Sequence, residues 1–213
     1  MTSFFANCPI RNRKPRGQGA SRRGEIIAAA TRIFVEEGVA AATMRRIAAA
    51  VGVSPTALYV YFPDKEAILT AIASGWFAEL LAALEASQNS SEDTVTKFRA
   101  GLRAYIAFGL ARPDSYRLTF LASPPLQSGG EPCRNIPEAD SSFEILVSGV
   151  MAMMQEGRFR QDDPAKVAET IWAALHGLTI LLIDQTAHLT TPKDALIETL
   201  IGMISSGFSV ESR

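Results

Sequence analysis

Apolar residues recur along most of the chain with the three-to-four-residue spacing of amphipathic helices. The first clear example begins near Arg22, where Ile27, Ala30 and Phe34 share one face, and Gly38 offers a left-handed residue that can end the helix. No segment alternates apolar and polar residues for long enough to predict a strand. The pattern therefore predicts an all-α fold of about nine helices.

Capping signals divide the following region into short helices. Thr43 precedes the run MRRIAAAV, while Ser54 and Pro55 combine a capping hydroxyl with a proline at the first helical position. We expect the third helix to end near Tyr61 and a longer fourth helix to follow it. Two short helices joined by a tight turn form a helix-turn-helix pattern.

Helical spacing continues to the end of the chain. Asp64 can cap the fourth helix, whose apolar face includes Ile72, Trp76 and Leu80. We expect the remaining helices over about residues 92–111, 113–121, 138–157, 164–186 and 192–208. This organisation predicts a disordered basic arm over residues 1–20, a helix-turn-helix DNA-binding domain over 21–66 and a larger helical domain over 67–213.

Composition excludes several classes of protein. The chain of 213 residues has two cysteines, Cys8 and Cys133, too few for a disulfide framework or a cysteine-rich zinc module. Its two histidines, His176 and His188, are too few for a histidine-built metal site. The longest apolar run, near residues 173–183, is too short to cross a bilayer, so we expect a cytoplasmic protein without a membrane segment.

Charge is distributed unevenly along the chain. Residues 1–65 contain ten Lys and Arg residues against four Asp and Glu, whereas the remainder contains eleven against eighteen. A basic first third on an acidic body indicates that this third contacts a polyanion. A solvated basic tail without a function would have the same composition, so the helix-turn-helix pattern decides between the two.

The helix-turn-helix pattern separates core positions from outward-facing ones. Ile47, Ala48 and Leu58 are apolar because the short helices pack there, and the N-terminal part of the third helix is left to enter a major groove. Hydroxyl and methyl groups at its start suit base edges, whereas the tyrosines and the lysine after it suit phosphates. The expected DNA contacts are Thr43, Arg45, Arg46, Ser54, Pro55, Thr56, Ala57, Tyr59, Tyr61 and Lys65.

Residues 22–69 resemble the DNA-binding domain of TetR/AcrR-family transcriptional regulators. The matching positions include Phe34, Gly38, Thr43, Ile47-Ala48, Gly52-Val53-Ser54, Leu58-Tyr59, Tyr61-Phe62 and Lys65-Glu66. The resemblance implies a helical ligand-binding and dimerisation domain and a homodimer on a near-palindromic operator in double-stranded DNA. By position it also implies base contacts from Arg45 and Thr56, and phosphate contacts from Thr43, Tyr59, Tyr61 and Lys65.

The C-terminal part resembles one class of TetR-like C-terminal domains, called WHG. The run Pro113 to Phe120 is similar to its P-x-x-Y-R-L-x-F stretch, and residues 171–178 are similar to its signature. The literal tripeptide here is Leu175-His176-Gly177, with the tryptophan at position 172, which departs from the pattern of the class. The class names no ligand.

Aromatic residues on the later helices are candidates for an effector cavity. The set is Tyr105, Phe108, Tyr116, Phe120, Phe143, Trp172 and His176, each of which could equally be plain core. His176 could bind an effector or be a core histidine that bonds to a carbonyl or a tyrosine hydroxyl. Because few charges fall on these faces, we expect a neutral or weakly polar hydrophobic effector.

We expect dimerisation through the last two helices, in a four-helix arrangement. Gly177 in mid-helix would be justified by the close approach of another helix, such as one across the two-fold axis of the dimer. The apolar faces predicted for this role contain Val167, Ile171, Leu178, Leu182, Leu196, Leu200 and Ile204.

The function that these features predict is a sequence-specific DNA-binding regulator, a repressor released from a palindromic operator by a small hydrophobic effector. The alternative is a constitutive or protein-regulated repressor without a ligand. An all-α enzyme or carrier with an incidental basic N-terminus is the competing class. We find no Cys–His pair, clustered carboxylates or glycine-rich phosphate loop, and therefore expect neither an enzyme, nor a cofactor, nor a metal site.

Overall fold

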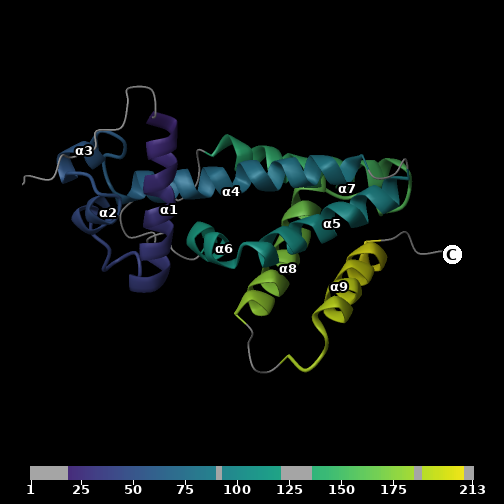
Figure 1. Cartoon of the computed structure of the whole chain (residues 1–213). Helices are drawn as coiled ribbons and strands as arrows, with labels where there is room; N and C mark the ends of the chain where they lie inside the picture. The colour runs from purple at the N-terminus through teal and green to yellow at the C-terminus, as the bar shows by residue number, and fades with distance from the viewer. Residues whose placement is uncertain (1–18, 90–92, 121–135, 185–188, 209–213) are drawn as a thin grey trace, which may run out of the picture.

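The described part of the chain is all α-helical. The computed structural model describes residues 19–89, 93–120, 136–184 and 189–208, and within them nine helices and no strand (Figure 1). This confirms the predicted fold class. Residues 1–18 of the predicted basic arm, which include Cys8, and residues 121–135, which include Cys133, lie outside the described residues, as does His188.

Three helices form the N-terminal end: α1 (Gly19–Glu37), α2 (Met44–Ala50) and α3 (Pro55–Tyr59). The predicted caps are confirmed, because the hydroxyls of Thr43 and Ser54 accept hydrogen bonds from the backbone nitrogens of Arg46 and Ala57, at 3.1 and 3.2 Å. Helix α3 ends at Tyr59, two residues before the predicted end. These hydrogen bonds fix where each short helix begins.

The helix-turn-helix turn is closed by a left-handed glycine and by an arginine from α1. Gly52 has a φ of +67°. Gly38, which directly follows the last residue of α1, has a φ of +79°. Arg22 reaches across from α1 and donates to the carbonyl of Val51 at 3.3 Å. The turn is therefore held both by its own backbone and by a neighbouring helix.

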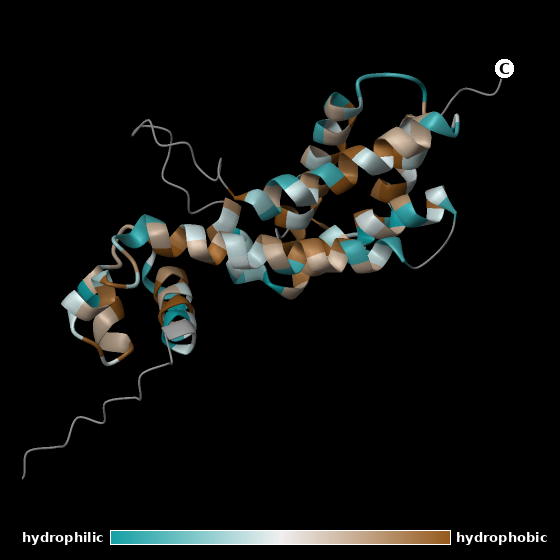
Figure 2. Ribbon diagram, turned by 90° about the horizontal axis from the view of Figure 1, so that it is seen from above, coloured by the Kyte–Doolittle hydropathy of each residue, from teal (hydrophilic) through white to brown (hydrophobic). Residues whose placement is uncertain are grey.

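Helix α4 (Lys65–Gln88) begins at the cap Asp64 and extends from the N-terminal helices into the body (Figure 1). It packs on α5 (Thr94–Ala111), α6 (Pro113–Phe120) and α7 (Pro137–Gln155). Helix α8 (Pro164–Ile183) packs on α5 and α7, and α9 (Lys193–Gly207) packs on α5 and α8. Apolar segments of these helices face one another inside the bundle (Figure 2).

Two apolar cores meet within α4. One core contains residues of α1, α2 and α3 and reaches along α4 to Ile72. The other begins at Ala73 and continues through the body to Ile204. Leu118 of α6 belongs to the first core, although its neighbour Tyr116 belongs to the second. Helix α6 is therefore packed into both.

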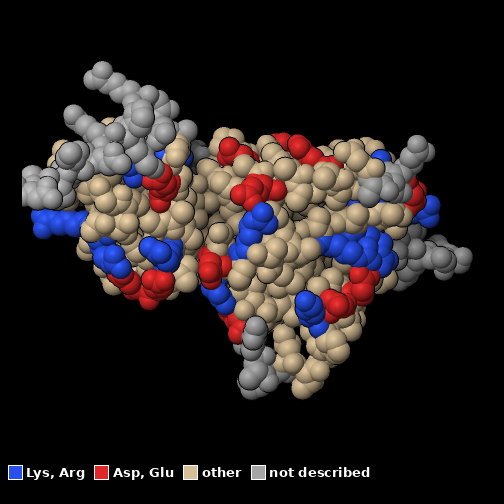
Figure 3. All heavy atoms as spheres, in the orientation of Figure 1, with Lys and Arg blue, Asp and Glu red and all other residues tan. Residues whose placement is uncertain are grey.

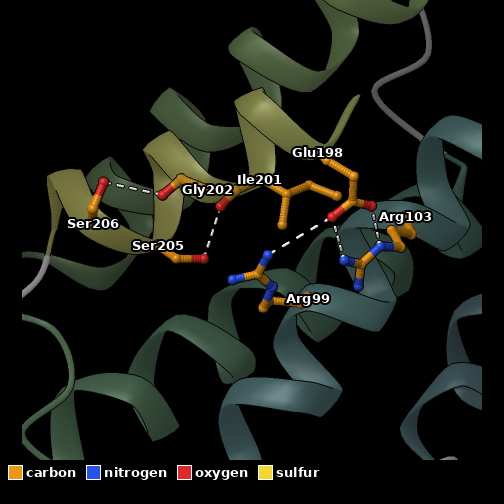
Figure 4. A network of polar contacts seen from close by, with 7 residues as sticks. All are labelled: Arg99, Arg103, Glu198, Ile201, Gly202, Ser205 and Ser206. Atoms are coloured by element: carbon orange, nitrogen blue, oxygen red, sulfur yellow. Dashed lines mark hydrogen bonds and ion pairs between the residues drawn. The ribbon is translucent and has the colours of Figure 1, made fainter. Parts of the chain in front are cut away.

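Helix α9 is held on α5 by charge as well as by apolar contact. Both oxygens of Glu198 accept from Arg103 at 2.6 Å, and Arg99 lies 3.8 Å from the same carboxylate (Figure 4). These hydrogen bonds lower the pKa of Glu198. The side chains are partly exposed, so water and salt screen these ion pairs and they add little to stability.

Two expectations from the sequence are corrected, one on the dimer interface and one on apolar helix length. Val167, Ile171 and Ile204 are buried in the core of the subunit, so they are not available to a partner. Helices α4 and α8 are also long and apolar enough to cross a membrane by length and hydropathy, contrary to the expectation from the apolar run alone. Part of that apolar character is buried, where the two helices pack against α5 and α7.

Gly109 allows three helices to approach closely. A Cβ atom at this position on α5 would lie 2.7 Å from Cγ2 of Thr179 on α8 and 3.0 Å from the ring of Tyr116 on α6. Those distances are shorter than any ordinary contact, and both neighbours are buried. The absence of a side chain at Gly109 therefore brings α6 and α8 together over α5.

We predict that Gly109→Ala lowers the free energy of unfolding. Overpacking of about 1–3 kcal/mol exceeds the gain of about 0.5–1 kcal/mol in helix propensity. Gly75→Ala on α4 is the matched control, because a Cβ there meets no atom within 4 Å, and it should be neutral or stabilising. Urea unfolding of both variants at one protein concentration checks this, and equal stabilities would contradict the packing described for Gly109.

Candidate functional site

The outer surface of α2 and α3 brings the predicted DNA contacts together. Thr43, Arg45, Arg46, Ser54, Pro55, Thr56, Tyr59 and Tyr61 are exposed, while Ala57 and Lys65 are half-buried. The tyrosines are 52% and 36% exposed, although large aromatic side chains of this kind normally pack inside. Leu58, one residue before Tyr59, is fully buried, so α3 presents one side to the core and the rest outward.

Three cations of this region differ in how they are held. Nζ of Lys65 donates to the carbonyl of Val39 at 2.8 Å, which ties the start of α4 to the turn after α1. Arg46 pairs with Glu37 at 2.9 Å. Arg45 has no ion pair or hydrogen bond within the described residues, so its guanidinium can take a base edge or a phosphate without giving up a partner.

Val60 is a surface residue that the sequence analysis missed. Its side chain is 82% exposed directly after α3, between two exposed tyrosines. A methyl-bearing side chain there suits contact with a thymine methyl or a sugar. The signal lay in the sequence Leu58-Tyr59-Val60-Tyr61, where only the first residue can face the core of so short a helix. Figure 3 shows Lys and Arg side chains at this end of the molecule.

A cavity of about 1470 Å³ lies in the body, lined by residues of α4, α5, α6, α7 and α8. Of the predicted effector-binding residues, Tyr105, Phe120, Phe143 and Trp172 line it. Phe108, Tyr116 and His176 do not, because they pack behind this wall. Phe77, Phe98 and Thr119 also line the cavity and were not predicted, since helical spacing shows that a side chain points inward but not whether it meets a neighbour or an empty space.

A chain of hydrogen bonds lies behind the aromatic wall. Trp172 Nε1 donates to the Tyr105 hydroxyl at 3.2 Å, the hydroxyls of Tyr105 and Tyr116 are 3.0 Å apart, and the Tyr116 hydroxyl lies 2.7 Å from His176 Nδ1. The tyrosine partner considered for His176 in the sequence is therefore present. This bond places His176 in the core network. Three residues that belong to this network or contact it face the cavity: Tyr105, Phe120 and Trp172.

Burial sets the protonation states in this network. Burial lowers the pKa of His176 and raises the pKa of both Tyr105 and Tyr116. When neutral His176 carries its proton on Nε2, its Nδ1 accepts from the Tyr116 hydroxyl. Tyr116 then accepts from Tyr105, which accepts from Trp172, so every bond runs in one direction along the chain.

Three buried polar atoms lack a partner within the described residues: Trp76 Nε1, Thr119 Oγ1 and Glu138 Oε2. Trp76 packs edge-on against Phe77 and Phe120, at centroid distances of 5.0 and 5.4 Å. Thr119 lines the cavity while only 4% exposed. The hydroxyl oxygen itself is buried, so a bound molecule reaches it only if neighbouring side chains move.

Helix α6 connects the cavity to the N-terminal helices. Thr119 and Phe120 line the cavity, whereas Leu118 packs in the core of α1, α2 and α3. Arg117 donates to Asp184 and to the carbonyl of Ile183, at 3.0 and 3.1 Å, which fastens α6 to the end of α8. The described residues contain no group of three His, Cys, Asp or Glu side chains able to hold a metal.

Comparison with known proteins agrees with this arrangement. The family description "Bacterial regulatory proteins, tetR family" matches residues 26–72, and "Tetracyclin repressor-like, C-terminal domain" matches residues 98–204. The C-terminal description does not name the WHG class, so that narrower resemblance remains a prediction.

Relatives and solved structures are similar over most of the chain. The chain is 30% identical to the transcriptional repressor KstR2 of Mycobacterium tuberculosis, over 68% of this chain and 73% of that one. It is 32% identical to the transcriptional activator FasR of Mycolicibacterium smegmatis, but spans only about half of that protein (48%). A Rhodococcus sp. RHA1 protein of unknown function shares the fold, with a TM-score of 0.76, 24% identity and coverage of 93% and 100% of the two chains.

These matches cover the helix-turn-helix and most of the helical body that contains the cavity. The exposed side of α2 and α3 lies in the first matched segment, and most of the cavity wall lies in the second or on the connecting helix α4. The chain belongs to the TetR family of bacterial transcriptional regulators and is a DNA-binding regulator of that family.

Proposed function

We propose that this protein is a homodimeric repressor that acts in the cytoplasm, binds a palindromic operator and is released from it by a small hydrophobic effector. One observation carries the proposal: α6 belongs both to the wall of a large apolar cavity and to the core of the DNA-facing helices. The helix-turn-helix and the cavity thus share a structural element. We assign no enzymatic activity to the cavity.

Release follows from the shared helix. A ligand that displaces Phe120 shifts α6, and Leu118 then shifts against α1, which contacts α6 directly. Helix α4 moves as well, because it packs on α6 and contributes residues to both cores. The effector acts only through its different affinity for the two arrangements, so it must fit the released form better than the DNA-bound form.

The proposed dimer interface uses the outer faces of α8 and α9. Ala173, Gly177 and Leu181 repeat every four residues on the exposed side of α8, and Met203 on α9 is 64% exposed. A Cβ at Gly177 meets no atom of the described residues within 4 Å, so the surface of α8 at this glycine is open to the helix of a partner subunit. Leu178, Leu182, Leu196 and Leu200 are half-buried and border this surface.

Selection of binding sites from random duplex DNA tests the proposal. Recovery of an inverted repeat, with half-site centres about 34–36 Å apart or a multiple of it, supports a dimeric sequence-specific repressor. A well-folded dimer that enriches no sequence contradicts it. The ligand-free alternative, a constitutive or protein-regulated repressor, is favoured if no small apolar molecule raises the melting temperature of a protein that still binds its operator.

We predict that Arg45→Ala and Tyr59→Ala each weaken operator binding by about 1–3 kcal/mol, because Arg45 offers an unpaired guanidinium and Tyr59 an exposed hydroxyl. Electrophoretic mobility shift at fixed salt measures the effect. Lys193→Ala, which removes an exposed cation at the start of α9, is the control and should bind normally. Variants of Arg45 and Tyr59 that shift operator DNA like the parent protein would refute their assignment.

We predict that Met203→Glu dissociates the dimer, because a buried unpaired carboxylate at an apolar interface is costly. Light scattering after size exclusion should then give the 23.0 kDa mass of one chain, with the helical circular dichroism unchanged. Met151→Glu is the matched control, since Met151 is also exposed (43%) but belongs to α7, outside the two helices of the proposed interface. Dimeric Met203→Glu would place the interface elsewhere.

A further inference from the structure

The exposed part of the cavity lining carries an excess of negative charge. Its carboxylates are Glu85 on α4, Asp140 and Glu144 on α7 and Glu169 on α8, against one half-buried cation, Lys97 on α5. None of the five makes an ion pair within the described residues. Figure 3 shows acidic side chains along the edge of the body where α4 and α7 lie. This exposed part of the lining, which we call the entrance of the cavity, therefore repels anions and attracts cations.

The other cations of α5 are directed away from this entrance. Arg99 and Arg103 are engaged by Glu198 on α9 (Figure 4). Arg112 pairs with Glu79 at 2.7 Å and lies 4.4 Å from the centre of the Phe108 ring. A carboxylate or phosphate group at the cavity would need such a guanidinium, since a bidentate arginine is the usual partner of these groups.

The helix N-termini at the cavity do not supply an anion site either. Helix α5 begins beside the cavity at Thr94, but the carboxylate of its cap, Asp93, accepts from the backbone nitrogen and the hydroxyl of Thr96, which lowers the pKa of Asp93. Helix α7 begins there with Glu138 and Asp140 in its first turn. The positive ends of both helices are therefore balanced by carboxylates of the same chain.

The interior of the cavity suits an apolar ligand with a cationic group. Aromatic side chains form much of the wall, and aromatic faces attract ammonium groups in addition to burying apolar surface. Thr119 also lines the cavity, and its buried hydroxyl lacks a partner within the described residues. The aromatic wall residues are Phe77, Phe98, Tyr105, Phe120, Phe143 and Trp172.

We propose that the cavity selects lipophilic cations, meaning amines or quaternary ammonium compounds with a long-chain or aromatic part, over carboxylates of the same apolar size. The acidic entrance concentrates the cation and the aromatic wall holds it. This inference rests on the proposed effector-binding role of the cavity. It refines the hydrophobic effector expected from the sequence by giving that molecule a charge.

Three probes with the same alkyl chain test the selection: dodecyltrimethylammonium, dodecan-1-ol and dodecanoate, each below its micelle concentration. Their binding to the full-length protein is measured by displacement of the neutral fluorophore N-phenyl-1-naphthylamine. We expect the cation to bind most tightly and the carboxylate most weakly, with a difference that shrinks as salt is added. Equal affinities, or tightest binding of dodecanoate, would overturn the inference.

Charge-neutralising variants locate the effect at the entrance. Glu85→Gln combined with Glu144→Gln should weaken the cation roughly two- to tenfold and strengthen dodecanoate. The matched control combines Glu36→Gln with Glu66→Gln, two exposed carboxylates remote from the lining, and should change neither. Equal effects of the two pairs would show that net charge, not the entrance, is responsible and would contradict the inference.

The outcome is separable from that of the proposed function. If neither the fluorophore nor any of the three probes binds, the charge selection is wrong, whereas a retained inverted-repeat operator would leave the DNA-binding role standing. If the operator is not found but the cation binds with the predicted selectivity, the inference about the cavity holds and the repressor proposal fails.

Discussion

The position of the DNA-facing helices depends on how α6 is packed. Three side chains of this eight-residue helix lie in different environments. Tyr116 belongs to the hydrogen-bond chain, Leu118 packs in the N-terminal core, and Phe120 lines the cavity. Close packing transmits small displacements, because interiors are as dense as organic crystals and have few alternative arrangements. A change at Phe120 cannot therefore be absorbed within α6 without moving Leu118 or breaking the attachment of Arg117 to α8.

The hydrogen-bond chain behind the aromatic wall also fixes how α6 is packed. Tyr116 is fully buried, and its hydroxyl is satisfied by Tyr105 and His176 on two other helices. Unsatisfied polar groups in such a place are costly, so α5, α6 and α8 are held in one register by these bonds. Gly109 makes the arrangement possible by letting the Tyr116 ring lie against the backbone of α5. A large cavity is thus placed beside a tightly specified junction.

Local signals in the sequence were sufficient for the fold and for the exposure of most of the predicted DNA contacts, whereas the contacts themselves stay a prediction. Capping hydroxyls at Thr43 and Ser54 act within one turn, so the starts of α2 and α3 could be predicted from neighbouring residues alone. The cavity could be predicted only in part. Tyr116 and Phe120 are one helical turn apart on α6, so periodicity places both on the same face, yet Phe120 lines the cavity and Tyr116 packs in the core. Burial of Val167 and Ile171 likewise depends on how α8 is rotated against α5 and α7, which helical periodicity does not fix.

Thermodynamic linkage between the cavity and the operator tests the central claim most directly. N-phenyl-1-naphthylamine is titrated into the protein with and without the selected operator duplex, and operator affinity is measured with and without the fluorophore. Coupled sites must affect each other by the same factor, usually about 5- to 150-fold. The account predicts that operator weakens fluorophore binding, that fluorophore weakens operator binding, and that the two factors are equal. Identical fluorophore affinity in the presence and absence of operator would contradict it.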